Sequence, residues 1–244
     1  MAAARAALLA RIAGAATRAG REPEAVALVA VSKTVPAERL RAAVAAGLVL
    51  LGENRVQELR QKAPYVPGAT WHLVGHLQGN KARPALEICA AVHSLDSLEL
   101  AERLDRLVAG GVGSELRRGG RRDEGGRPLA PPPLPVYLEV NVDRDPAKSG
   151  FRPEVLAREL GTIAALPGLR LEGLMTVGRL GASAEAARPT FSALRRLGER
   201  LRGAEPRLGA GLSMGMSDDF EVAVEEGATI VRVGRAIFGE RPTA

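Results

Sequence analysis

The segment VALVAVSK, residues 26–33, sets the pattern that decides the fold: an almost continuously apolar run is followed at once by polar side chains. Runs of this kind are typical of strands that are buried on both faces, as in a parallel sheet covered by helices. Seven more runs of the same character follow, at residues 48–53, 71–76, 88–94, 136–142, 171–177, 211–215 and 229–234. The sequence therefore predicts eight strands.

Helical patterns separate these runs, so strand and helix alternate along the chain. They lie at residues 37–46, 97–109, 153–166, 184–201 and 218–226. A spacing of about 30 residues per unit predicts an α/β protein with a single (β/α)8 TIM barrel, and a doubly wound open sheet is the alternative. Leu8, Leu9, Ile12 and Ala16 recur at helical spacing. They predict an extra N-terminal helix packed on the barrel rather than a targeting segment.

One segment, residues 110–135, interrupts the alternation, because Gly, Arg and Pro are dense there and no periodicity persists. A boundary between two domains and an insertion within one domain are the two interpretations. Four strand–helix units on each side complete a count of eight. This favours a flexible insertion within a single domain that spans residues 1–244.

The composition is that of a globular protein, with 244 residues of which 46% are hydrophobic and 25% charged. The net charge is +6, but only 3% of the residues are aromatic, which leaves little material for stacking bases, so we expect no specific nucleic-acid partner. Cys89 is the only cysteine, and a reducing cytoplasm is therefore expected. No apolar run reaches the ~18 residues of a membrane span. No set of His, Asp and Glu has metal-ligand spacing.

Polar residues at the carboxyl ends of the strands are the candidates for a functional site, because these ends converge on one mouth of a barrel. Lys33 follows the first apolar run directly and shares a strand face with Val29 and Val31. Partial burial favours the neutral amine, which is the form that attacks an aldehyde to give a Schiff base. The alternative is an ordinary lysine that extends into solvent.

Two segments late in the chain have the character of phosphate-binding loops. In SMGMSDD, residues 213–219, Gly215 permits a close turn, and Ser217 is predicted to cap a helix that begins at Asp218. The segment RVGRAIFG, residues 232–239, follows the last strand. Phosphate sites in these barrels are often formed by the loops after strands seven and eight. A plain helix cap is the alternative for either segment alone.

Together, these segments resemble the family of pyridoxal phosphate (PLP) homeostasis proteins. The resemblance rests on LVAVSKTVP with Lys33, GENRVQEL with Asn54, WHLVGHLQGNK, NVDRDPAKSGF with Lys148, GLMTVG with Met175, LSMGMSDDFEVAV with Ser213 and Ser217, and GATIVRVGRAIFG with Arg232 and Gly234. These motifs span nearly the whole chain in the family's order.

The resemblance implies a barrel like the N-terminal domain of alanine racemase, with the cofactor PLP held as a Schiff base on Lys33. It implies that Asn54 lies near the cofactor ring, that Met175 belongs to the binding site, and that Arg232 faces the pyridine nitrogen. The turn from Ser213 to Ser217 and the Gly234 loop are then expected to hold the phosphate. Position 235 is Arg where many relatives carry Thr, so Arg235 is expected to pair with the phosphate by its charge instead.

The role that the family implies is to carry PLP or to regulate its supply, with apo-PLP enzymes as recipients. We expect no membrane partner, and we expect the protein to be a monomer. The alternative is a PLP-dependent amino-acid racemase or lyase of low activity. Arg232 cannot accept a hydrogen bond, so a pyridine nitrogen beside it stays unprotonated and withdraws electrons poorly. We also expect no second domain to supply a catalytic tyrosine. The acid or base that a racemase needs would have to come from Tyr65, Tyr137 or a histidine.

Overall fold

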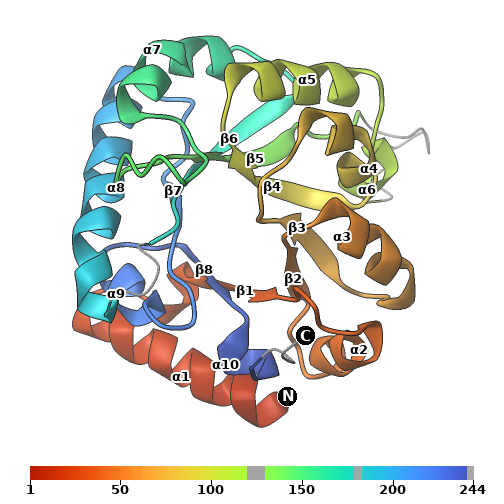
Figure 1. Cartoon of the computed structure of the whole chain (residues 1–244), viewed down its shortest axis with the longest axis vertical. Coiled ribbons are helices and arrows are strands. Elements are labelled where there is room, and N and C mark those ends of the chain that lie inside the picture. Colours follow the sequence, from red (N-terminus) through yellow and green to blue (C-terminus); the bar gives the residue numbers. More distant parts are fainter. Residues whose placement is uncertain (120–129, 179–182, 241–244) are drawn as a thin grey trace.

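Eight parallel strands pair in chain order, and β8 pairs with β1 to close a barrel (Figure 1). The computed structural model describes residues 1–119, 130–178 and 183–240. The strands are β1 (Ala27–Val31), β2 (Leu50–Glu53), β3 (Thr70–Leu73), β4 (Cys89–Leu95), β5 (Leu134–Glu139), β6 (Leu169–Met175), β7 (Gly211–Ser213) and β8 (Ile230–Val233). The predicted TIM barrel is confirmed, and the open sheet is excluded.

The helices lie outside the ring of strands (Figure 1). They are α1 (Ala2–Arg18), α2 (Ala37–Ala45), α3 (Val56–Lys62), α4 (Ala82–Leu86), α5 (Leu98–Ala109), α6 (Ser114–Arg118), α7 (Pro153–Ala164), α8 (Ala184–Ala204), α9 (Phe220–Glu225) and α10 (Arg235–Phe238). Short 3-10 turns lie at Pro23–Ala25, Ala63–Tyr65 and Gly79–Lys81. The five helices predicted between the strands are present within three residues at each end, whereas α3, α4, α6 and α10 lie outside the predicted ranges. Among the described residues, no helix is long and apolar enough to cross a membrane.

Two apolar cores hold the barrel, one on each side of the strands. The larger core lies between strands and helices and includes Leu51, Leu73 and Leu104. The smaller one fills the barrel interior with Val29, Val74, Tyr137, Met175 and Ile230. Because side chains alternate along a strand, β1, β2, β5, β6 and β8 supply apolar side chains to both cores, which is why their sequences are apolar at consecutive positions.

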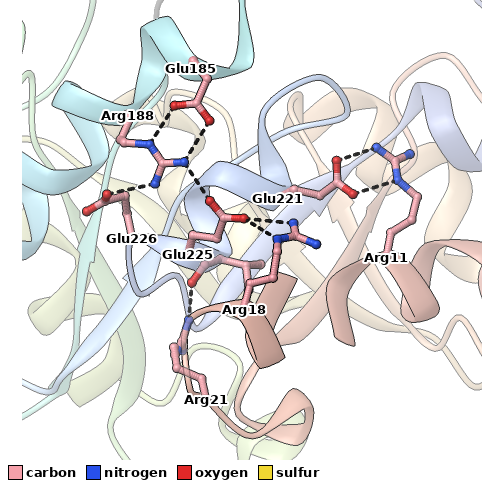
Figure 2. Close-up of polar contacts among 9 residues, drawn as sticks. Arg11, Arg18, Arg21, Glu185, Arg188, Glu221, Glu225 and Glu226 are labelled. Atoms are coloured by element: carbon pink, nitrogen blue, oxygen red, sulfur yellow. Dashed lines mark hydrogen bonds and ion pairs between the residues drawn. The ribbon is translucent and has the colours of Figure 1, made fainter. Parts of the chain in front are cut away.

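Helix α1 packs along α9, which confirms the predicted N-terminal helix (Figure 1). Its apolar stripe of Leu8, Ile12, Ala15 and Ala16 is buried. Charged groups surround the stripe, and Figure 2 shows that they connect α1 and the chain after it to α9 and α8. The pairs are Arg11 with Glu221, Arg18 with Glu225, and Arg188 with Glu185, Glu225 and Glu226, while Arg21 donates to the carbonyl of Val224.

The prediction that residues 110–135 form a flexible insertion without regular structure is wrong for part of its length. Residues Ser114–Arg118 form the short helix α6, and β5 already begins at Leu134. Val112 is buried, and Gly113 (φ +66°) lies so close to Leu86 that a Cβ atom would meet its carbonyl oxygen at 2.0 Å. This contact anchors the start of the segment on α4. Residues 120–129 lie outside the described residues, so the single-domain assignment stays a prediction.

Strand β5 is shorter than predicted. It ends at Glu139, and Val140 forms only an isolated bridge to Phe151. The side chain of Asn141 then closes a turn, because its Nδ2 donates to the carbonyl of Asp145 and its Oδ1 accepts the amide of the same residue. The turn diverts the chain away from the strand, and this directs Glu139 and Asn141 toward the carboxyl end of the barrel.

Candidate functional site

A cavity of about 530 Å³ lies at the carboxyl ends of the strands. It is lined by Val31, Lys33, Asn54, Val74, Val177, Met216, Ser217, Asp218, Arg232, Gly234, Arg235 and Glu240. Six of the eight predicted site residues therefore meet in one place. The other two, Met175 and Ser213, are buried below the cavity in the barrel interior. A cavity of this volume is within the usual range for small-molecule sites.

Lys33 lies at the end of β1, half-buried, with its backbone held on both sides. The carbonyl of Ser32 accepts a hydrogen bond of 2.8 Å from the Lys62 ammonium, and the amide of Thr34 donates one of 2.9 Å to Glu58. Thr34 has a φ of +65°, in the left-handed region that a β-branched residue rarely adopts. Such strain persists only where neighbouring contacts impose it, as the bond to Glu58 does here.

A buried carboxylate lies beneath this turn. Glu53 is fully buried at the end of β2 and contacts both the Lys62 ammonium, at 2.5 Å, and the Ser32 hydroxyl, at 2.8 Å. Burial raises the pKa of Glu53, and Lys62 and Ser32 counter only part of that rise. Burial acts in the same direction on Glu58, but hydrogen bonds from Lys62 and Thr34 outweigh it and lower the pKa of that group. Lys62 therefore holds two carboxylates and the backbone before Lys33 together.

The first predicted phosphate loop follows β7. Gly215 has a φ of +91°, and a Cβ atom there would meet Ala223 Cβ at 2.5 Å, so only glycine fits. The prediction that Ser217 caps a helix at Asp218 is wrong, because α9 begins at Phe220. The carboxylate of Asp219 accepts the Met216 amide at 2.6 Å and closes the turn instead.

This closed turn leaves donors for a ligand. Among the described residues, the backbone amides of Ser217 and Asp218 donate to no protein acceptor. The Ser217 hydroxyl lies 3.5 Å from the amide of Ala236 in α10, so the two predicted phosphate-binding segments are neighbours. Adjacent backbone amides that point into a concavity are a common way to bind a phosphate group.

Arg235 lies at this end of the cavity with its side chain already paired. Its guanidinium contacts Asp218 and lies 3.7 Å from Glu240. The expected charge pairing of Arg235 with a phosphate therefore competes with two carboxylates. All three side chains are at least 45% exposed, so these pairs are weak and exchange readily with solvent.

Arg232 is the buried cation of the site, with 5% of its surface exposed. It donates to the carbonyl and the hydroxyl of Ser213, at 2.7 and 2.8 Å, and to the carbonyl of Thr176 at 2.9 Å. Three of its five N–H groups are thus used, and the other two are available to a ligand. Burial lowers the pKa of Arg232 to about 10, with Glu139 and Asp219 acting against that shift. It remains a cation at neutral pH.

A chain of two histidines continues from Arg232 into the barrel interior. The Nδ1 atom of His93 lies 2.8 Å from the Ser213 hydroxyl, and its Nε2 atom lies 2.8 Å from Nδ1 of His72. Because Arg232 donates to the Ser213 oxygen, we assign the hydroxyl proton to His93 Nδ1, and His93 then donates from Nε2 to His72. Burial lowers the pKa of His72 to about 4, and burial also lowers the pKa of His93 well below its ordinary value. Both rings are therefore neutral.

Two smaller features adjoin the main cavity. A cavity of about 490 Å³ shares Asn54 with it and includes Arg55, His76 and Lys81. Another of about 160 Å³ shares Val177 and includes Glu139. Among the described residues, no three His, Cys, Asp or Glu side chains gather as metal ligands.

Sequence reasoning missed two charged residues that shape this region, Lys62 and Glu139. Lys62 follows Glu58 by four residues, a spacing that places both on one face of a helix and was visible in the sequence. Glu139 is the only charged residue in the apolar run VYLEVNV, residues 136–142. A carboxylate in such a run is a signal of a buried titratable group.

Residues 4–242 match the family described as "Alanine racemase, N-terminal domain". Over 235 residues the chain is 43% identical to the pyridoxal phosphate homeostasis protein of Pseudomonas aeruginosa, covering 95% of this chain and 92% of the relative. The chain belongs to the pyridoxal phosphate homeostasis protein family. The relative of that name from Escherichia coli is 38% identical over 238 residues and is covered to 92%, with 95% of this chain aligned.

Solved structures of this family's fold agree with the assignment. PipY of Synechococcus elongatus, solved with PLP bound, is 39% identical, with a TM-score of 0.76 over 93% of this chain and 100% of PipY. Alanine racemase from Corynebacterium glutamicum is 18% identical, with a TM-score of 0.62 over 98% of this chain and 62% of that protein, and shows likeness of fold alone. The resemblance inferred from the sequence motifs is confirmed.

Proposed function

We propose that the protein binds PLP in the 530 Å³ cavity, as a Schiff base on Lys33, and serves intracellular PLP homeostasis by holding and delivering the cofactor without catalytic turnover. The observation that carries the proposal is the meeting of Lys33, Arg232 and the two loops after β7 and β8 in one cavity. The PLP-bound structure of the PipY relative supports it.

The residues present fit each part of this cofactor. Lys33 offers an amine for the aldehyde, and the free amides of Ser217 and Asp218 offer donors for the phosphate. Gly234, where a Cβ atom would meet the Val31 carbonyl at 3.1 Å, keeps the loop after β8 close to β1. Val31, Val74 and Val177 supply apolar contacts for a ring.

PLP, when bound, supplies an aldehyde that captures amines and a ring that withdraws electrons from them. Arg232 is held by Ser213 and Thr176. A guanidinium can donate hydrogen bonds to a ring nitrogen but cannot accept one, so it does not stabilise the protonated form of that nitrogen. It thereby orients a ring without strengthening its electron withdrawal. The backbone amide of Asn54 donates to the Glu53 carboxylate, and this bond fixes Asn54 at the edge of the cavity.

Absence of turnover is supported by where the acid and base candidates lie. Tyr65 is 65% exposed on the surface, and Tyr137 is buried in the barrel interior, where burial raises its pKa to about 12. His72 and His93 are neutral and bonded to each other. Among the described residues, no tyrosine or histidine lines the main cavity.

We further propose that the protein acts as a monomer, with apo-PLP enzymes as recipients.

The cofactor-binding proposal is tested by loading the protein with PLP, reducing it with borohydride and mapping the modified lysine by mass spectrometry. The Lys33→Ala variant is expected to lose both the visible absorbance and the trapping. Lys81→Ala is the matched control, because Lys81 lines the neighbouring cavity and has no ion-pair partner among the described residues. Full trapping in Lys33→Ala, at Lys81 or Lys148, refutes the assignment.

Delivery is tested by mixing the PLP-loaded protein with an apo-PLP enzyme and following the recovery of that enzyme's activity. An amino-acid turnover screen runs beside it. Transfer without turnover supports the carrier. Racemisation or elimination by the wild-type protein at rates of order one per second, typical of modest enzymes, refutes the carrier proposal and supports a racemase or lyase instead.

A further inference from the structure

A small cavity beside the main one contains a carboxyl group that the proposed function does not use. The cavity has a volume of about 160 Å³ and includes Glu139, Asn141, Lys148, Thr176 and Val177 among its walls. Val177 also lines the main cavity. The space is large enough for a small molecule.

Among the described residues of this wall, Glu139 alone has a buried side-chain oxygen or nitrogen without a protein partner. Only 8% of its surface is exposed, and its Oε2 atom is buried with no hydrogen bond. Asn141, Lys148 and Thr176 donate to backbone carbonyls or, in the case of Lys148, also to Asp143. A buried polar atom without a hydrogen-bond partner is costly. A ligand that donates to this carboxyl therefore gains more binding free energy than one that contacts only groups already hydrogen-bonded within the protein.

The charges that face Glu139 come from four elements. Asp96 follows β4, His76 follows β3, Arg232 lies on β8, and Lys148 lies in the loop after β5. Burial, followed by repulsion from Asp96, raises the pKa of Glu139 to about 7, and Arg232 and His76 offset only part of the rise. The carboxyl is therefore ionised in mildly basic solution and neutral in mildly acidic solution.

We propose that this cavity is a binding site for a primary ammonium group, such as the amino end of a short aliphatic amine or amino acid, with Glu139 as its acceptor. Hydrogen bonds to a charged donor are about twice as strong as neutral ones, so a cation is favoured over an alcohol. An anion is disfavoured because Glu139 and Asp96 repel it. The Lys148 ammonium, which could otherwise attract it, is already used by Asp143 and the carbonyls of Val177 and Gly178.

The site does not depend on PLP, so its test uses the cofactor-free protein. Binding of n-propylamine, propionate and 1-propanol is measured by ligand-observed NMR and calorimetry at about pH 8, where Glu139 is ionised. We expect n-propylamine to bind more tightly than the other two. Glu139→Gln and Glu139→Leu are expected to weaken it at least tenfold. Glu87→Gln, an exposed carboxylate on the far end of α4, is the matched control and should bind as wild type.

The pH dependence provides a second readout. Affinity for n-propylamine is expected to fall more than tenfold between about pH 8 and pH 5.5, and the fall should persist in His76→Gln but vanish in Glu139→Gln. Equal amine affinity in wild type and both Glu139 variants, or tighter binding of propionate, overturns the proposal. PLP binding by Glu139→Gln is measured separately and is expected to equal that of wild type, so a failure here leaves the cofactor site unaffected.

Discussion

The Lys62 ammonium donates a hydrogen bond of 2.8 Å to the carbonyl of Ser32, the residue immediately before Lys33. The same ammonium contacts Glu53 and Glu58, and Glu58 accepts the amide of Thr34 immediately after Lys33. One cation on α3 therefore fixes the backbone on both sides of the proposed cofactor lysine. Fixing the backbone directs the Lys33 side chain without contacting its amine.

Replacing Lys62 tests this arrangement. Lys62→Met leaves the fully buried Glu53 without its charge partner, and loss of one partner of a buried pair costs about 3–5 kcal/mol of unfolding free energy. We expect a loss of this size in urea unfolding, together with faster release of PLP. The double variant Glu53→Gln/Lys62→Met removes the stranded charge and should recover most of the stability.

The recovery in the double variant separates the two roles of Lys62. If stability returns but PLP is still released quickly, the bond to Ser32 positions Lys33. Lys81→Met, which removes a lysine without an ion-pair partner among the described residues, should match wild type in both measurements. An unchanged PLP release rate in Lys62→Met contradicts the positioning role.

The pairing of Arg235 with Asp218 leads to a prediction about phosphate binding. Asp218→Asn removes a carboxylate from the proposed phosphate end of the cavity and leaves the Arg235 guanidinium with only the longer contact to Glu240. Both changes favour an anion, so PLP should bind a few-fold more tightly at low salt, a gain of under about 1 kcal/mol because the groups are exposed. Fluorescence titration at low and high salt measures it. Weaker PLP binding in Asp218→Asn would mean that the pair itself shapes the loop.

The structural features that the sequence predicts well are those determined by residues close together in the chain. Apolar runs such as residues 26–32 and the helical stretches between them are local patterns, and the order of strand and helix restricts the topology to a few folds. The placement of Lys33, Asn54 and Arg232 around one cavity follows from that topology, because strand ends of a barrel converge.

Other features depend on packing between distant segments and could not be read from the pattern. Ser217 and Asp219 are equally good capping residues, and the turn hydrogen bond from Met216 to Asp219 decides between them. The bond from Lys62 to Ser32 joins residues 30 apart in sequence. Glu139 stands out in its strand, but its lack of a partner is a property of the folded interior.

The attachment of α1 offers a direct comparison of apolar and charged contacts. Ile12 is 2% exposed, and Ile12→Ala is expected to cost about 2–5 kcal/mol. The Arg11–Glu221 pair is half-exposed (Figure 2), so Arg11→Ala is expected to cost less than about 1 kcal/mol, and less still at high salt. Urea unfolding of both variants measures the difference. Equal losses would show that the Arg11–Glu221 pair holds the helix as strongly as Ile12 does, against the prediction.

The histidine chain below Arg232 predicts an acid-dependent loss of stability. The folded pKa of His72 is about 4, against about 6.5 in an unfolded chain. Below about pH 6.5 the unfolded chain therefore binds a proton that the folded protein excludes. The resulting stability is fully present above pH 6.5 and is lost as the pH falls toward 4, at about 1.4 kcal/mol per pH unit for each such histidine. His93, whose pKa burial also lowers well below its ordinary value, adds to the same loss.

His72→Gln isolates this effect, because a glutamine oxygen accepts the His93 proton as the imidazole does but does not titrate. Urea unfolding at about pH 7 and about pH 5 should show a smaller loss of stability in His72→Gln than in wild type, by about 2 kcal/mol. His76→Gln is the control, since that ring is 52% exposed and paired with Asp96. A pH dependence in His72→Gln identical to that of wild type would show that other groups govern the acid response.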